Sequence, residues 1–191
     1  RIYENWFPLF LILTNLIMHP EALTENSRAI FPHLRHFKDF YLAGGTALAL
    51  QIGHRVSVDF DLFSRNPIKR ELYPEVRKMF KKQNIEPAVN GLRMLGIAEM
   101  AATKAYSIGR RGSYKDYVDL YFIISSGYCS VAEIIKLAQK KYGAEFNARL
   151  FLEQLVYLSD ITDEAIIFIK KRIVKSELER FFALKVKQVK L

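Results

Sequence analysis

The sequence lacks the residues that build disulfides, zinc clusters of cysteine and membrane spans. Its 191 residues include a single cysteine, Cys129, so the chain can form neither an internal disulfide nor a cysteine-based zinc site. The longest apolar run, residues 7–13, is too short to cross a membrane, and no signal-peptide cleavage site follows it. These absences predict a cytoplasmic protein without membrane contact.

Acidic residues are scarce relative to basic ones. The chain has 20 Asp and Glu against 29 Lys and Arg, a net charge of +9. The basic excess gathers in residues 65–82, 104–115 and 170–191. Clustered cations favour a polyanionic partner, because binding to phosphates releases counterions, although solvated helix faces are the alternative interpretation.

Glycine and proline are also few, with 9 and 6 residues, and nowhere do they form a linker. Hydropathy patterns predict strands at 39–43, 56–63 and 85–89. The expected helices are 4–18, 24–37 with an interruption at Pro32, a short helix after Gly45, 68–82, 97–108, 114–125, 131–142, 147–158 and 163–187. This order predicts an α+β fold, with a mixed core in residues 1–95 and a helical C-terminal region in residues 96–191.

Two aspartates lie two positions apart on the clearest expected strand, VSVDFDLF. Strand geometry sends Asp59 and Asp61 to one face while the apolar residues between and around them face the other. Two carboxylates on one face repel each other, which favours a hard divalent cation such as Mg²⁺ with open positions for phosphates. A solvated pair at a sheet edge is the alternative, because this short motif is weak alone.

A glycine pair interrupts the strand before the DxD motif, in the segment YLAGGTALAL. Gly44 and Gly45 allow close approach of the backbone, and the free N–H groups at the start of the next helix attract phosphate. Thr46 is the expected N-cap of that helix. The motif is neither a dinucleotide fingerprint nor a P-loop, because the further glycines and the lysine are missing.

A third segment, GIAEMAATKAYSIGRRGSYKDYVDLYF, carries cations and carboxylates close together. Asp116 and Asp119 share a helix face because they are three residues apart. Lys104 and Arg110 are candidates for holding a triphosphate or for stabilising charge on a transferring phosphate. In isolation, an ordinary salt bridge would be the better explanation of this lysine.

Together these three motifs resemble the nucleotidyltransferase toxins of the AbiEii/AbiGii abortive-infection family, part of the DNA polymerase beta-like nucleotidyltransferase superfamily. The resemblance rests on GGTALAL, HRVSVDFDLFS and the segment 104–121, within residues 41–125. It implies a small mixed sheet flanked by helices, a helical C-terminal half, and metal-dependent transfer of a nucleotide from an NTP. It also implies a toxin that is paired with an antitoxin.

The resemblance further implies roles for individual residues. Asp59 and Asp61 would bind the metal, Mg²⁺ or Mn²⁺, and act in catalysis. Lys104 and Asp119 match the family's later functional lysine and aspartate and would also be catalytic. The residues expected by position to bind the NTP are Gly44, Gly45, Thr46, Ser57, Arg110, Lys115 and Asp116.

The chain departs from the superfamily pattern after the DxD motif. Further strands, and often a third carboxylate, usually precede the later lysine helix, whereas residues 66–95 have room for a helix and one strand. Either the sheet is reduced or residues are missing from the sequence, and the start at Arg1 without a methionine favours the second explanation. Glu86 is the acidic residue on the expected strand, and we do not assign it as a third ligand.

The leading hypothesis is therefore a nucleotidyltransferase with RNA, tRNA included, as its acceptor and a cognate antitoxin as its partner. One alternative is a nucleotidyltransferase that modifies small molecules, against which the basic surface argues. The other is a catalytically inactive, basic RNA- or partner-binding module of the same fold. His54, in the loop before the DxD strand, is expected to be exposed, and Cys129 to be a small buried residue.

Overall fold

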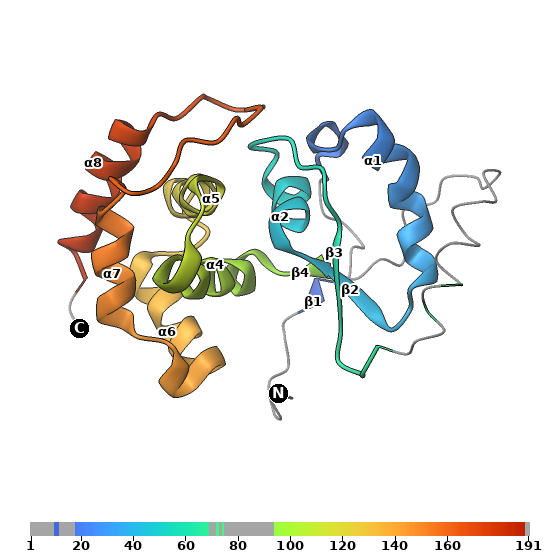
Figure 1. The fold of residues 1–191 in the computed structure, drawn as a ribbon, viewed down its shortest axis with the longest axis horizontal. Coiled ribbons are helices and arrows are strands. Elements are labelled where there is room, and N and C mark those ends of the chain that lie inside the picture. The colour runs from blue at the N-terminus through green and yellow to red at the C-terminus, as the bar shows by residue number, and fades with distance from the viewer. Residues whose placement is uncertain (1–9, 12–17, 69–71, 73, 75–93, 190–191) are drawn as a thin grey trace.

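The computed structural model describes residues 10–11, 18–68, 72, 74 and 94–189. Figure 1 shows a half that contains the sheet, with α1 and α2, and a half made of helices α4 to α8. The two halves meet where β4 ends at Leu95 and α4 begins at Ile97, the point at which we placed the boundary. The α+β fold class is confirmed, while the independence of the two halves as domains stays a prediction.

A small mixed sheet forms the centre of the first half. Its strands are β1 (Phe10–Leu11), β2 (Phe40–Ala43), β3 (Asp61–Ser64) and β4 (Met94–Leu95), in the order β1-β4-β2-β3. The β2 strand pairs antiparallel with β3, so that Ala43 lies opposite Asp61, and parallel with β4. This register places the glycine pair that follows β2 beside the second aspartate of the DxD motif.

Short helices surround the sheet. The η1 turn (Pro20–Ala22) precedes α1 (Glu25–Ile30), whose N-cap Thr24 accepts a hydrogen bond from Ser27 N at 3.1 Å. The helix then tightens into η2 (Phe31–His36), which confirms the expected interruption at Pro32 because proline has no N–H to continue the helix. The α2 helix (Gly44–Ile52) is apolar and almost wholly buried, and it ends at Gly53 with a φ of 65°.

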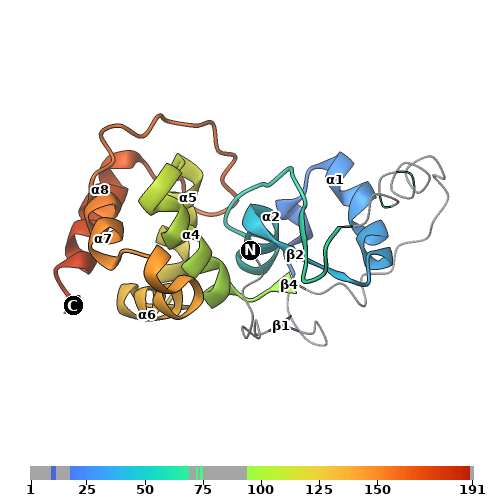
Figure 2. The same ribbon diagram turned by 60° about the horizontal axis from the view of Figure 1, so that its bottom comes forward.

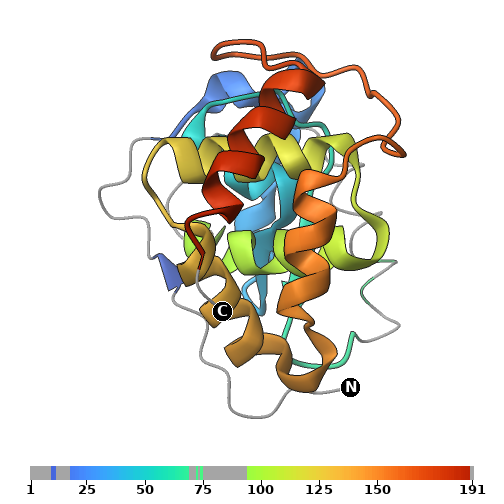
Figure 3. The same cartoon turned by 90° about the vertical axis from the view of Figure 1, so that its left-hand side faces the viewer.

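The second half consists of helices that pack on α4 and α5. The expected helices are confirmed with small changes at their ends: α4 (Ile97–Arg111), α5 (Tyr114–Ser125), α6 (Val131–Tyr142) and α7 (Ala148–Val156), with the η3 turn (Gly143–Glu145) between the last two. The final helix is α8 (Lys175–Val186), which lies beside α7 in Figure 3. The α2 helix packs against α4 and α5, so one core runs through both halves.

An irregular segment, residues 157–174, returns from α7 to the sheet half before α8 begins, and we call it the strap (Figures 1 and 2). Ile167 O accepts a hydrogen bond from Val56 N at 2.8 Å, and His54 O accepts one from Ile169 N at 3.0 Å. The predicted helix over 163–187 is therefore wrong at its start. These backbone groups pair with the segment before the DxD motif, which leaves them unavailable to a helix.

The expected strand at 56–63 is also shorter than predicted. It begins at Asp61, because the backbone before it is paired elsewhere: Val56 with the strap, and Ser57 N with Ala22 O at 2.8 Å. Phe10 and Leu11 form a strand where a helix over 4–18 was expected, and the rest of that prediction lies outside the described residues. The predicted helix over 68–82 also lies almost wholly outside the described residues, and the predicted strand over 85–89, with Glu86, lies wholly outside them.

Within the described part of the chain, no helix combines the length and the apolar character needed to span a membrane.

Candidate active site

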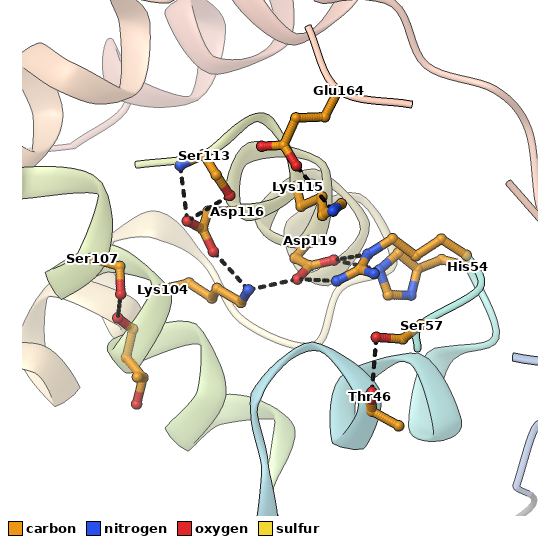
Figure 4. A network of polar contacts seen from close by, with 12 residues as sticks. Thr46, His54, Ser57, Lys104, Ser107, Ser113, Lys115, Asp116, Asp119 and Glu164 are labelled. Carbon is orange, nitrogen blue, oxygen red and sulfur yellow. Dashed lines mark hydrogen bonds and ion pairs between the residues drawn. The ribbon is translucent and has the colours of Figure 1, made fainter. Parts of the chain in front are cut away.

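A pocket of about 380 Å³ opens between the two halves. Its walls come from the start of α2, the segment 55–61, the middle of α4, the start of α5 and residues 165–167 of the strap. Every motif that the sequence singled out therefore contributes to one cavity. Figure 4 shows several of the polar side chains that line it, which are Thr46, Ser57, Lys104, Ser113, Lys115 and Asp116, together with polar residues behind them.

Both aspartates of the DxD motif line this pocket. Asp61 is the first residue of β3, and Asp59 lies two residues before the strand begins. Partial burial raises the pKa of Asp61 above its ordinary value, and the negative charge of Asp59 raises it further, against the opposing effect of Lys104. A bound cation would relieve the repulsion between the two carboxylates.

The glycine pair makes room for two side chains of the site. Gly44 has a φ of 69°, and a Cβ placed on it would collide with the carboxylate of Asp61. A Cβ on Gly45, which lines the pocket, would lie 2.6 Å from Nη2 of Arg55. Both positions thus need glycine, one for its backbone conformation and the carboxylate, the other for the guanidinium.

Thr46 was expected to cap α2, but it does not. The helix begins at Gly44 with Ala43 as its N-cap, so Thr46 already lies inside the first turn. Its hydroxyl donates to the main-chain oxygen of Asp59 and lies 2.8 Å from Ser57 Oγ. Thr46 and Ser57 therefore join the start of the helix to the segment that carries the aspartates, at the edge of the pocket.

Asp119 is the centre of a buried polar network (Figure 4). It is 0% exposed, and its Oδ1 accepts hydrogen bonds at 2.7 Å from Arg55 Nε and from His54 Nε2. Its Oδ2 accepts one from Arg55 Nη2 at 3.0 Å and lies 2.8 Å from Lys104 Nζ. Lys104 Nζ also donates to Asp116 at 2.6 Å. We call these five residues the Asp119 network.

The network keeps Asp119, Lys104 and Arg55 charged despite their burial. Burial would raise the pKa of Asp119, but Lys104 and Arg55 outweigh it and hold the pKa well below the ordinary value. Burial would lower the pKa of Lys104, and Asp119 and Asp116 more than offset this and raise it. The pKa of Arg55 is raised in the same way, with Asp119 opposing the effect of burial. Two cations and two carboxylates thus balance in charge.

Asp116 ties the network to the start of α5. Its Oδ2 accepts a hydrogen bond from Ser113 N at 3.0 Å and lies 3.1 Å from Ser113 Oγ, while its Oδ1 accepts from Lys104. Asp116 and Asp119 reach the same lysine, as their spacing of three residues predicts. Lys115 also lines the pocket, and its Nζ pairs with Glu164 of the strap at 3.0 Å.

Arg110 is not brought into this pocket. It donates to Glu145 O at 3.1 Å, and its guanidinium lies over the ring of Tyr106, 3.8 Å from the ring centre. Arg110 follows Lys104 by six positions, which turns the two side chains about 120° apart around α4. Arg110 lines a different and smaller hollow beside η3, so this pocket does not support its expected part in holding a triphosphate or stabilising a transferring phosphate, which stays a prediction.

The sequence analysis missed two residues of the network. His54 was expected to be exposed, yet it is 0% exposed and donates to Asp119. Burial lowers the pKa of His54, which the hydrogen bond to Asp119 opposes without offsetting. Arg55, which lines the pocket, was not assigned a role. A signal was present in YVDLYFII, where a carboxylate amid apolar helix residues indicates burial and hence a cationic partner.

The pocket carboxylates suit a hard divalent cation. Of the three that line it, Asp116 is paired with Lys104, while the charges of Asp59 and Asp61 repel each other. Two carboxylates with phosphate oxygens of a substrate form the donor set that Mg²⁺ prefers. Among the described residues no group of three or more His, Cys, Asp or Glu side chains could hold a metal ion, so a third protein carboxylate is not found in that part of the chain.

Comparison with known proteins agrees with this arrangement. The family model described as the nucleotidyl transferase AbiEii toxin of type IV toxin–antitoxin systems matches residues 28–86 and 67–185. An uncharacterized protein of Aquifex aeolicus (strain VF5) is 32% identical over 183 residues, covering 78% of this chain and 87% of the relative. No solved structure matches the chain significantly. The chain therefore belongs to the AbiEii family of nucleotidyl transferase toxins. Membership of this family implies an NTP substrate and a cognate antitoxin.

Proposed function

We propose that this enzyme transfers a nucleotide from an NTP to a hydroxyl of cellular RNA, tRNA included, in a reaction that needs Mg²⁺ or Mn²⁺. The observation that carries the proposal is the meeting of Asp59 and Asp61 with the α2 start and Lys104 in one pocket. A volume of about 380 Å³ falls within the range of sites that bind small ligands. NTPs and cellular RNA are cytoplasmic, so we place the reaction there.

In the proposed reaction the acceptor hydroxyl attacks the α-phosphorus of the NTP. A new phosphorus–oxygen bond forms as the bond to the β-phosphate oxygen breaks, pyrophosphate leaves, and the hydroxyl proton passes to solvent. Asp59 and Asp61 would hold Mg²⁺, which when bound supplies charge stabilisation to the phosphates and activates the attacking oxygen. The N–H groups at the start of α2, with Gly45 and Ser57 beside them, would hold phosphate oxygens.

The cations of the pocket would offset the negative charge that the phosphates bring. Lys104 Nζ lies between two carboxylates, and the Lys104 side chain is 13% exposed, so it is held in one place at the pocket wall. Such a preorganised charge stabilises a transferring phosphate without reorganising during the reaction. In this scheme Asp119 is a positioning residue rather than a catalytic one, because it is fully buried and holds Lys104 and Arg55 in place.

RNA as the acceptor is supported by charge close to the pocket. Residues 165–167 of the strap line the cavity, and the exposed cations Lys170, Lys171 and Arg172 follow directly. A strand of RNA that reaches the pocket could run along these cations and release counterions from its phosphates. The net charge of +9 favours the same partner over a cationic small molecule.

The test is transfer of label from each α-³²P NTP, with Mg²⁺, to total cellular RNA and protein. The variant Asp59→Asn/Asp61→Asn keeps the shape of both side chains and removes their charge. The matched control is Asp39→Asn/Asp160→Asn, which removes two exposed carboxylates that do not line the pocket. We expect labelled RNA with the wild type and the control and none with the first variant.

Two results would contradict the proposal. Label that appears only in protein would refute RNA as the acceptor while leaving the transfer reaction in place. Label that persists in the Asp59→Asn/Asp61→Asn variant would refute the assignment of these aspartates. Either result counts only if circular dichroism shows that the variants are folded.

A further inference from the structure

Two apolar side chains at the mouth of the polar pocket are unusually exposed. Val58 is 59% exposed and Ile167 is 69% exposed, and both line the cavity. They come from segments far apart in the sequence, one before the DxD motif and the other in the strap. Single exposed apolar residues are common on protein surfaces, but two that border the same charged cavity from opposite segments form a defined apolar rim.

The backbone beneath both side chains is firmly held. Val58 O accepts a hydrogen bond from Ser27 Oγ at 3.0 Å. Ile167 O accepts the bond from Val56 N, and the neighbouring Phe168 is bridged to Arg55. The half-buried Ile166 and Phe168 pack against the core on either side of Ile167. The exposure of the rim is therefore a property of the folded structure and not of a fraying end.

The cavity lining combines charged side chains with this apolar rim, and the two kinds of surface correspond to the two parts of a nucleotide. The charged part of the lining includes Asp59, Asp61 and Lys104, which suit a metal-bound triphosphate. A nucleobase has flat apolar faces, which gain stability when an apolar side chain removes them from water. The side chains of Val58 and Ile167 have no hydrogen-bonding groups, so they can contact any base but cannot read its edge.

We propose that Val58 and Ile167 form the nucleobase subsite of the active site and clamp the base of the NTP by apolar contact. This inference rests on the proposed function and adds the residues that hold the base. It assigns to the strap a part in substrate binding, because Ile167 reaches the cavity only through the pairing of the strap with residues 54–56. The subsite contributes affinity for all four NTPs alike.

The test compares NTPs with a ligand that has no base. Isothermal titration calorimetry would measure the Kd of ATP, GTP, CTP, UTP and inorganic tripolyphosphate, each with Mg²⁺, for wild type and Val58→Ser/Ile167→Ser. Loss of the apolar contact is expected to raise the Kd of every NTP about tenfold. The Kd of tripolyphosphate is expected to stay unchanged, because the charged lining residues Asp59, Asp61 and Lys104 are intact in the double variant.

The matched control is Leu184→Ser, which alters an apolar side chain of α8 that is 63% exposed and does not line the cavity. It should bind every ligand as the wild type does. Unchanged NTP affinity in the double variant would overturn the inference, as would a tripolyphosphate Kd that rises as much as those of the NTPs. Absence of NTP binding by the wild type would refute the proposed function and the inference with it, so the two failures are distinguishable.

Discussion

At the scale of single residues, the site depends on a carboxylate that substrate does not reach. Asp119 accepts hydrogen bonds from His54 and Arg55 and pairs with Lys104 while 0% exposed. A buried charge is tolerated only when its partners replace water, and here three side chains do so. The same contacts hold Arg55 and Lys104 at the wall of the pocket, so both the stability of the fold and the proposed chemistry depend on Asp119.

Replacing Asp119 by asparagine should destabilise the protein severely. The change leaves Lys104 and Arg55 buried with less negative charge, and removing one partner of a buried ion pair costs about 3–5 kcal/mol. Urea unfolding measures the loss of free energy. The control, Glu153→Gln, breaks the exposed pair with Arg149 and should leave the free energy nearly unchanged. A loss in Asp119→Asn no larger than in the control would contradict the central role of the network.

The burial of His54 predicts a pH dependence of stability. Because burial lowers the pKa of His54 in the folded state, the unfolded chain binds a proton more readily below the ordinary value of 6.5. The contribution of this residue to the free energy of unfolding should therefore fall as the pH drops from 6.5 toward the folded pKa, and stay constant above 6.5. The pKa of Asp119 lies far below this window, so that carboxylate does not titrate within it.

Urea unfolding on both sides of pH 6.5 tests this prediction by comparing the wild type with His54→Gln. Glutamine can still donate a hydrogen bond to Asp119 but cannot take up a proton. The wild type should lose more free energy of unfolding on acidification than the variant does. Equal losses would show that His54 is not held neutral.

At the scale of elements, the turn between β2 and α2 needs glycine at position 44 for two separate reasons. Gly44 has a positive φ, and the space where its Cβ would lie is taken by Asp61 from the paired strand β3. The sequence motif thus marks a close approach between two elements as well as a turn. Gly127 offers a comparison, because its φ is 76° and nothing lies within 4 Å of the Cβ position.

Gly44→Ala should therefore weaken the site, whereas Gly127→Ala should not. Both variants place an L-residue in the left-handed region, at a cost of about 1–2 kcal/mol each. Gly44→Ala should in addition displace Asp61 and abolish the binding of NTP with Mg²⁺. Calorimetry of NTP binding and urea unfolding on both variants measure the two effects. Full NTP affinity in Gly44→Ala would contradict the proximity of Asp61.

At the scale of the whole molecule, the strap joins the helical half to the site. Tyr114, on α5, donates through its hydroxyl to Ile173 O of the strap at 3.0 Å. Tyr117, one turn further along α5, donates to Gln154 O of α7 at 3.1 Å. These two buried tyrosines form a natural pair of test positions, since only the first holds the strap.

Tyr114→Phe should loosen the strap, whereas Tyr117→Phe should not. Each variant removes one hydrogen bond from a main-chain carbonyl, at a cost of about 1–3 kcal/mol. Hydrogen exchange at the amides of Val56 and Ile169, which bond across the strap, should become faster in Tyr114→Phe alone. Equal exchange in both variants would contradict the anchoring of the strap by Tyr114.

Much of the local structure could be predicted from the sequence alone. The helices α5 and α6 begin and end where the sequence predicts, because apolar residues recur at helical spacing between clear end signals. The spacing of Asp116 and Asp119 correctly placed both on one face toward Lys104. Residues 163–174 of the strap were predicted as part of a helix, because the backbone groups at 54–56 that pair with the strap are more than a hundred residues away and leave no mark on local periodicity.

The residue types and their order thus establish the family, the α+β class and the carboxylates, glycines and lysine that converge on the pocket. These features depend on neighbours in the chain and on motifs that lie within short stretches of it. Packing between distant segments decides the burial of His54 and Asp119, the position of Arg110 away from the pocket and the apolar rim of Val58 and Ile167. The physical reason is that desolvation and charge pairing depend on which surfaces meet, and that is set by the assembled fold.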